Sequence, residues 1–371
     1  MAPTGDGMAS GLGSPAAARG DALVWLHIGD LSRIVALADA LPPASLDFAV
    51  LPGDSAEDGA AAQYTLLREA LAGLRLPLHI LPGDHDMKPG NLDAFHWMLG
   101  LTPLPQAVRV KGCRCLFLDV VSAGTGSPDF RLGPAQLAWA EQETEEAEAA
   151  GEQVVVFMHT YPADLRDGGE RLGALLARSS IRCVDMGHTH YNELANDGRT
   201  IFMAARSTGQ VEEGPPGFSL AAIDGGIVSW RFKPLDHAWP FVLITQPADA
   251  RLVIGPDQVV DGAFAVRAKV VGDAAVQSVE LQVGQGAWAP MAAVQGAVAL
   301  WEAQAETPDI VRVRVRDVRG RLDQDAIQPA GPGWTAPPRA ADGSDRDRIG
   351  AWPERGIFDT QFGPNRNGRH W

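Results

Sequence analysis

The stretch IRCVDMGHTH, residues 181–190, joins an apolar run to a pair of histidines. The run from Ile181 to Met186 has the length and composition of a buried strand. Side chains two positions apart on an extended chain point to the same face, so His188 and His190 can enter one site. Gly187, just before them, leaves room for a close backbone approach. The stretch therefore predicts a strand whose carboxyl end presents two imidazoles.

Four earlier apolar runs also stop in residues that bind metals. They are HIGD with Asp30, PGD with Asp54, PGDHD with Asp84, His85 and Asp86, and MHTYP with His159. In α/β sheets, ligands gather beyond the carboxyl ends of strands, because the loops there leave side chains free to converge. Carboxylates supply charge and can bridge cations, and imidazoles add directional nitrogen ligands. The pattern predicts one crevice that holds two divalent or trivalent cations.

Helical patterns alternate with these strands from about Asp21 to Leu235. Helices are expected over residues 32–41, 60–74, 91–100, 133–150 and 169–180. A hairpin is expected at AVRVKGCRCLFLDVV, residues 107–121, and a second one turns at Gly225. Strand and helix in alternation are typical of an α/β domain.

The sequence pattern changes at Pro240. Segments in which apolar and polar residues alternate, separated by turn residues, replace the helical period. About 90 residues of this kind suit a small β-sandwich, which we expect to be immunoglobulin-like. The predicted organisation is a flexible leader over 1–20, an α/β domain over 21–236, the sandwich over 240–329 and an extended tail over 330–371, ordered only where its aromatic residues dock. The leader lacks the pattern of a signal peptide, and no apolar run approaches the roughly 20 residues that span a bilayer.

Composition limits the partners. The chain has 31 Lys and Arg against 46 Asp and Glu, a formal charge of −15, which opposes binding to long nucleic acid. Its three cysteines, Cys113, Cys115 and Cys183, cannot form a complete disulfide framework and favour a reducing compartment, with the cytoplasm as the expected location. No membrane partner is expected, and the sandwich is a candidate surface for homo-oligomer formation.

The five motifs, in this order, resemble those of the calcineurin-like metallophosphoesterase superfamily, and GDHD and GHTH resemble its cyclic-nucleotide phosphodiesterase branch. The resemblance covers roughly residues 21–235 and implies a four-layer α/β/β/α sandwich of two mixed sheets. It implies that Asp30 and His190 hold a first metal and that Asp54 bridges. The second metal would have the set Asp54, Asp84, His159 and His188.

The resemblance also implies a reaction. A metal-bound hydroxide would attack a small phosphodiester or phosphomonoester, and His85 would assist the leaving group. Asp86 would orient that imidazole or its neighbours. The metals would be Mn, Fe or Zn. A diester is preferred because of the phosphodiesterase-like motifs.

Two positions depart from the family pattern. Ser32 stands where the family has the first-motif histidine, so the first metal lacks one ligand. Asp84 replaces the family's asparagine and adds negative charge, which suits a harder cation such as Mn²⁺. The alternative function is therefore a catalytically impaired module that binds metal or ligand on the same fold. Arg206 is predicted to lie on the surface rather than to meet substrate, and His27 is predicted to be packed or at the surface rather than a ligand.

Overall fold

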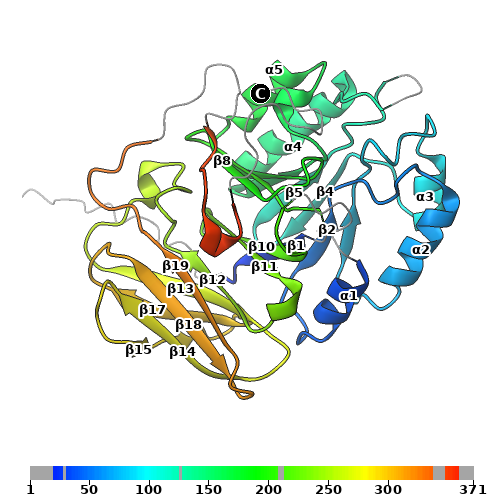
Figure 1. The fold of residues 1–371 in the computed structure, drawn as a ribbon. Coiled ribbons are helices and arrows are strands. Elements are labelled where there is room, and N and C mark those ends of the chain that lie inside the picture. Colours follow the sequence, from blue (N-terminus) through cyan, green and yellow to red (C-terminus); the bar gives the residue numbers. More distant parts are fainter. Residues whose placement is uncertain (1–19, 28–30, 125–127, 208–212, 337–346, 359–371) are drawn as a thin grey trace, which may run out of the picture.

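A computed structural model describes residues 20–27, 31–124, 128–207, 213–336 and 347–358. Within them, two mixed sheets form the centre of the first two thirds of the chain (Figure 1). The five-stranded sheet has the order β11-β10-β1-β2-β3 and contains β1 (Leu23–His27), β2 (Phe48–Leu51), β3 (Leu78–Ile80), β10 (Gly217–Asp224) and β11 (Ile227–Pro234). The six-stranded sheet has the order β4-β5-β6-β7-β9-β8 and contains β4 (Gln106–Val110), β5 (Cys113–Phe117), β6 (Gln153–Phe157), β7 (Ile181–Met186), β8 (Glu193–Asn196) and β9 (Ile201–Ala204).

The two sheets pack face to face through aromatic side chains. Trp25 and Phe48, from the first sheet, have ring centroids 5.6 Å and 5.8 Å from that of Phe157 in the second. Both faces of β1 and β2 are buried, which explains why these strands are continuous apolar runs. Leu23 and Trp25 face the other sheet, whereas Val24 and Leu26 join the core under the helices.

Helices cover the outer faces of both sheets. Helices α1 (Leu31–Asp39), α2 (Ala61–Leu71) and α3 (Asp93–Leu99) lie beside the five-stranded sheet, and α4 (Pro134–Ala150) and α5 (Gly169–Leu176) beside the six-stranded one (Figure 1). Short 3₁₀ turns are η1 (Pro162–Asp164), η2 (Leu235–His237), η3 (Pro256–Gln258) and η5 (Pro353–Arg355). The layers follow the predicted order α/β/β/α. Each predicted helix is present; α1 begins one residue before its expected start, and the other helix ends lie at the expected bounds or up to four residues inside them.

Two four-stranded antiparallel sheets follow. One has the order β12-β13-β17-β16 and contains β12 (Phe241–Gln246), β13 (Phe264–Val271), β16 (Ala292–Ala293) and β17 (Leu300–Ala305). The other has the order β15-β14-β18-β19 and contains β14 (Val276–Val283), β15 (Ala289–Pro290), β18 (Val311–Asp317) and β19 (Leu322–Ile327). In β18 the valines are buried and share a core with Val242 and Ile244 of β12, so the two sheets form a sandwich.

Buried ion pairs join the sandwich to the five-stranded sheet. Arg231 of β11 makes a two-pronged contact with Asp323 of β19, at 2.6 Å and 3.0 Å, and Lys233 approaches the same carboxylate at 3.2 Å.

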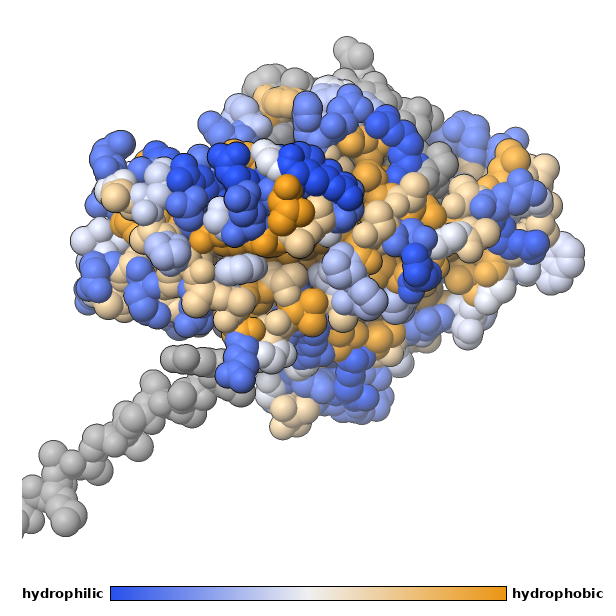
Figure 2. Space-filling model, turned by 90° about the horizontal axis from the view of Figure 1, so that it is seen from below, coloured by the Kyte–Doolittle hydropathy of each residue, from blue (hydrophilic) through white to orange (hydrophobic). Residues whose placement is uncertain are grey.

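On the face seen in Figure 2, hydrophobic residues gather toward the middle and hydrophilic ones toward the sides. Among the described residues, no helix is long and apolar enough to cross a membrane. All three cysteines are free and buried.

Candidate metal centre

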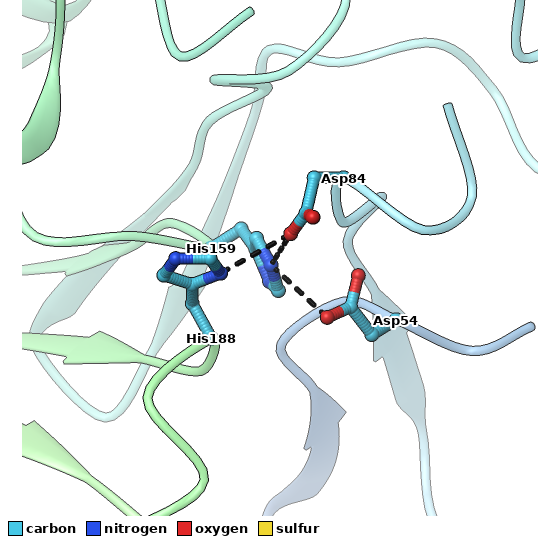
Figure 3. A group of neighbouring side chains, drawn as sticks. All are labelled: Asp54, Asp84, His159 and His188. Carbon is cyan, nitrogen blue, oxygen red and sulfur yellow. Dashed lines mark hydrogen bonds and ion pairs between the residues drawn. The ribbon is translucent and has the colours of Figure 1, made fainter. Parts of the chain in front are cut away.

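Four side chains from both halves of the α/β region converge at one point (Figure 3). Asp54 follows β2, Asp84 follows β3, His159 follows β6 and His188 follows β7. One ligand atom from each lies within 4.8 Å of all the others. The sequence predicted these four as the complete set for one metal, and the structure brings them together.

The ring of His159 is held by a backbone carbonyl group. Its Nδ1 donates to the carbonyl oxygen of Pro52 at 2.7 Å. The other nitrogen, Nε2, is the one left for a metal and lies 3.1 Å from Asp84 Oδ1 and 3.5 Å from Asp54 Oδ2. A backbone carbonyl that fixes one ring nitrogen is the usual support of a metal-binding histidine, because it orients the ring and raises its basicity.

Asp84 lies between the two imidazoles. Its Oδ1 is 3.1 Å from His159 Nε2 and 3.1 Å from His188 Nδ1. Burial favours the neutral form of Asp84, but the hydrogen bonds with the two histidines hold its pKa well below the ordinary value. Burial likewise opposes charge on His159, yet Asp54 and Asp84 hold its pKa well above the ordinary value. The two carboxylates thus attract positive charge to one point.

This donor set fits a metal ion. Two carboxylates and two imidazoles are hard and borderline donors of the kind that bind Mn, Fe and Zn. The buried Nε2 of His188 has no hydrogen-bond partner among the described residues, and a buried polar atom of this kind calls for a partner such as an ion. Asp54, Asp84, His159 and His188 would hold the ion.

No family model matches this chain. Individual known proteins are nevertheless similar in sequence to part of it. The 3',5'-cyclic adenosine monophosphate phosphodiesterase CpdA of Escherichia coli K12 is 28% identical over 201 residues, which are 52% of this chain and 70% of CpdA. The glycerophosphodiester phosphodiesterase GpdQ of Enterobacter lignolyticus is 31% identical over 159 residues, which are 39% of this chain and 56% of GpdQ.

This chain is similar in sequence to phosphodiesterases, as expected for a calcineurin-like metallophosphoesterase. It is a metal-dependent phosphoric ester hydrolase, as the sequence motifs predicted. Among solved structures, a dimetal phosphatase from Danio rerio is similar with a TM-score of 0.41 and 14% identity, covering 58% of this chain and 97% of the other.

The structure describes only some of the residues predicted to hold the first metal. Asp30 lies outside the described residues, and Ser32 falls in the first turn of α1. His190 lines a pocket together with Asp54 and His188, although it is not among the four atoms that lie closest together. His188 and His190 both have left-handed backbone angles, with φ of 65° and 66°. The two imidazoles are therefore presented by a turn after β7 rather than by the strand itself, which corrects the predicted period-2 geometry.

His85 stands at the edge of the centre. Its backbone N–H donates to Asp54 Oδ1 at 2.9 Å. Its Nδ1 lies 2.9 Å from the carbonyl oxygen of Glu57 and 2.8 Å from Lys88 Nζ. Because Nδ1 is engaged on this side, Nε2 is the nitrogen left for a substrate. The side chain is 21% exposed, so a ligand can reach it.

Asp86 joins the two ligand loops. Its buried carboxylate accepts hydrogen bonds at 2.9–3.2 Å from Gly83 N, Ser55 N, Ala56 N and Tyr64 Oη. Burial raises its pKa to about 6, against the lowering effect of these bonds. Within the described residues, none of these hydrogen bonds involves the His85 ring. Of the two roles predicted for Asp86, its contacts match the support of neighbouring groups rather than of that imidazole.

Two further pocket residues were not predicted as part of the site. His27 is buried as expected, and its Nδ1 lies 2.9 Å from Asp185 Oδ1. Arg206 is 1% exposed, so its predicted surface position is wrong. Both line the same pocket as His188 and His190. The composition around Arg206, MAARSTGQ, carries no signal of burial, because the side chains that cover it come from remote parts of the chain.

Proposed function

We propose that this protein hydrolyses a small phosphodiester, in preference to a phosphomonoester, with two metal ions bound at the strand ends. The observation that carries the proposal is the four-donor cluster of Asp54, Asp84, His159 and His188. Similarity to CpdA and GpdQ supports the diester, because both names specify small phosphodiesters. The net charge of −15 supports a small substrate rather than long nucleic acid.

Bound metals of this kind supply a water molecule of lowered pKa and neutralise charge on the phosphoryl oxygens. The chain supplies the geometry. Asp54 contacts His159 Nε2 through one carboxylate oxygen and the His85 backbone through the other, and it would hold both ions. Asp30 and His190 would complete the first ion's shell, and Ser32 would leave that shell one imidazole short.

His85 would act on the leaving group. With Nδ1 accepting a hydrogen bond from Lys88 Nζ at 2.8 Å, the neutral ring carries its proton at Nε2 and would present it to an alkoxide that departs from phosphorus. A proton held at Nε2 would be transferred to that oxygen. Lys88, beside the ring, adds a positive charge on the same side of the site. Asp86 would keep the loops that carry Asp54 and Asp84 at a fixed distance.

We infer a catalytic domain over 21–236, an immunoglobulin-like sandwich over 240–329 and a tail over 330–371, supported by the separate sheet systems. We infer a cytoplasmic location, supported by three free buried cysteines. The sandwich offers a surface for homo-oligomer formation, and Mn, Fe or Zn is the expected metal.

The test compares hydrolysis of bis-p-nitrophenyl phosphate and p-nitrophenyl phosphate with Mn²⁺, Zn²⁺ or Fe²⁺ added. The diester should be hydrolysed faster. His85→Ala should lower kcat by about 10²- to 10⁴-fold, the usual contribution of a general acid, with the metal content unchanged. His237→Ala, an exposed histidine on η2, is the control and should behave as wild type. Metal binding without turnover of either ester would favour the impaired module instead.

A further inference from the structure

A segment near the end of the chain, Asp347–Phe358, crosses back over the α/β region and is called the strap below (red in Figure 1). It runs beside the edge strand β8, where Ile349 N donates to Leu194 O at 3.0 Å. Trp352 and Ile357 are each 3% exposed. Arg355 is 1% exposed and reaches Asp325 of the sandwich at 2.9 Å. The strap is thus docked on both the sandwich and the six-stranded sheet.

The strap reaches the wall of the catalytic pocket at Gly356. The Gly356 carbonyl oxygen accepts hydrogen bonds from Arg206 Nη2 at 2.6 Å and from Asn192 Nδ2 at 2.8 Å. The guanidinium of Arg206 also lies over two rings, that of Phe232 at 4.2 Å and that of the strap's Phe358 at 5.0 Å. The Glu213 Oε1 atom lies 4.0 Å from Arg206 Nη2. A buried guanidinium costs solvation, and here carbonyl groups and rings offset that cost.

Backbone hydrogen bonds also connect Arg206 and its neighbour to the turn that presents His188 and His190. The Arg206 backbone N donates to Asn192 Oδ1 at 2.8 Å, and the next residue, Ser207, donates from its backbone N to His190 O at 3.2 Å. Left-handed backbone at His188 and His190, which Thr189 separates, is costly and persists only where the surroundings hold it. The chain from Ala205 to Ser207 is one of those surroundings, and it lines the same pocket.

We propose that the strap is a positioning element of the catalytic pocket, which keeps the Gly187–His190 turn in its ligand-presenting shape by fixing Arg206. The proposal rests on the function proposed above, since it assigns the turn a role in metal binding. The C-terminal third of the chain would then support metal binding. Arg355 pairs with Asp325 of the sandwich, and the adjacent Gly356 accepts a hydrogen bond from Arg206.

Two glycines of the strap allow a matched test. Gly356 and Gly350 both have φ of 81°, so an alanine is strained equally at either position. A Cβ at Gly356 would stand 2.8 Å from Phe232 Cδ1 and 3.3 Å from Asn192 Nδ2, whereas a Cβ at Gly350 would meet nothing within 4 Å. Gly356→Ala therefore displaces the strap where it holds Arg206, and Gly350→Ala reproduces only the backbone strain.

The first measurement is Mn²⁺ affinity by calorimetry on the full chain. Gly356→Ala and Arg206→Met should each bind Mn²⁺ at least about 10-fold more weakly than wild type, the usual effect of losing a group that supports metal ligands. Gly350→Ala should bind as wild type. Equal affinity in all four proteins would overturn the proposal. If Arg206→Met does not fold, Phe358→Ala replaces it, because that ring is 40% exposed and its loss spares the core.

The second measurement is hydrogen exchange in the metal-free proteins, over peptides that cover Met186–Ser207. Exchange should be faster in Gly356→Ala and Arg206→Met than in Gly350→Ala. If exchange accelerates while no protein, wild type included, binds metal, the proposed function fails and the coupling of strap to turn stands. If wild type binds metal and exchange is the same in every variant, the coupling fails and the proposed function stands.

Discussion

The carbonyl oxygen of Pro52 accepts a hydrogen bond from His159 Nδ1 at 2.7 Å, across a separation of 107 residues. Pro52 follows β2 of one sheet and His159 follows β6 of the other, so this bond joins the two sheets at the metal centre. Gly53 makes the approach possible, because it has φ of 118° and a Cβ there would stand 2.1 Å from His159 Nδ1.

Gly53→Ala should therefore push the His159 ring out of its position. Overpacking of this kind costs about 1–3 kcal/mol of folding free energy, and metal affinity should fall by at least about 10-fold. Thermal unfolding and a Mn²⁺ titration measure the two effects. Gly73→Ala is the control, since the nearest atom to a Cβ there is 3.6 Å away. Wild-type affinity in Gly53→Ala would show that the ring does not need this placement.

Asp84→Asn restores the residue that the family pattern has at this position. The amide keeps an oxygen near His159 and His188 but removes a negative charge from the centre. We expect metal affinity to fall by about 10-fold and hydrolysis to persist, whereas Asp84→Ala should lose both. Metal titration and diester hydrolysis check this. Asp84→Ala with wild-type hydrolysis would exclude Asp84 as a ligand.

Asp86→Ala removes the acceptor of four hydrogen bonds and leaves buried donors unpaired. The free energy of unfolding should fall by about 3 kcal/mol or more, as expected for several buried donors that lose one charged acceptor. Asp167→Ala is the control, because that side chain is 71% exposed. Urea unfolding measures both variants, and equal stabilities would show that Asp86 does not hold the two loops together.

Lys233 makes the stability of the protein depend on pH. Burial lowers its pKa from 10.5 to about 8, although Asp323 opposes the shift. Between these two values the unfolded chain binds more protons at Lys233 than the folded one, so this group adds stability as the pH rises from about 8 to about 10.5. Between pH 7.5 and 9.5, wild type should gain about 1–2 kcal/mol relative to Lys233→Met. Parallel pH profiles of the two proteins would contradict this.

The four-donor cluster was predictable from the sequence for a simple reason. Parallel strands end at the same edge of a sheet, so the residues that follow β2 and β3 lie together in one sheet and those that follow β6 and β7 in the other. The face-to-face packing of the two sheets, which the family resemblance implied, then brings the two pairs together. The turn geometry at His188 and His190 was not predictable, because the extended period of β7 stops at Met186.

Features that depend on contacts between remote segments of the chain could not be predicted from the sequence. Strand β8, Glu193–Asn196, has a polar residue at each end. Both polar side chains pair with distant groups: Tyr161 Oη lies 3.1 Å from Glu193 Oε2, and Asn196 donates to the carbonyl oxygens of Arg251 and Val253. Arg206 is buried by a strap 150 residues further along the chain. No local pattern records either arrangement, since each depends on where separate segments meet.

The metal content of the purified protein tests the central claim most directly. Wild type, after gel filtration in metal-free buffer and elemental analysis, should retain at least one Mn, Fe or Zn ion per chain. The variant His159→Ala/His188→Ala should lose that ion, whereas His237→Ala should keep it. Equal metal content in wild type and the double variant would contradict the assignment of this cluster as the metal centre.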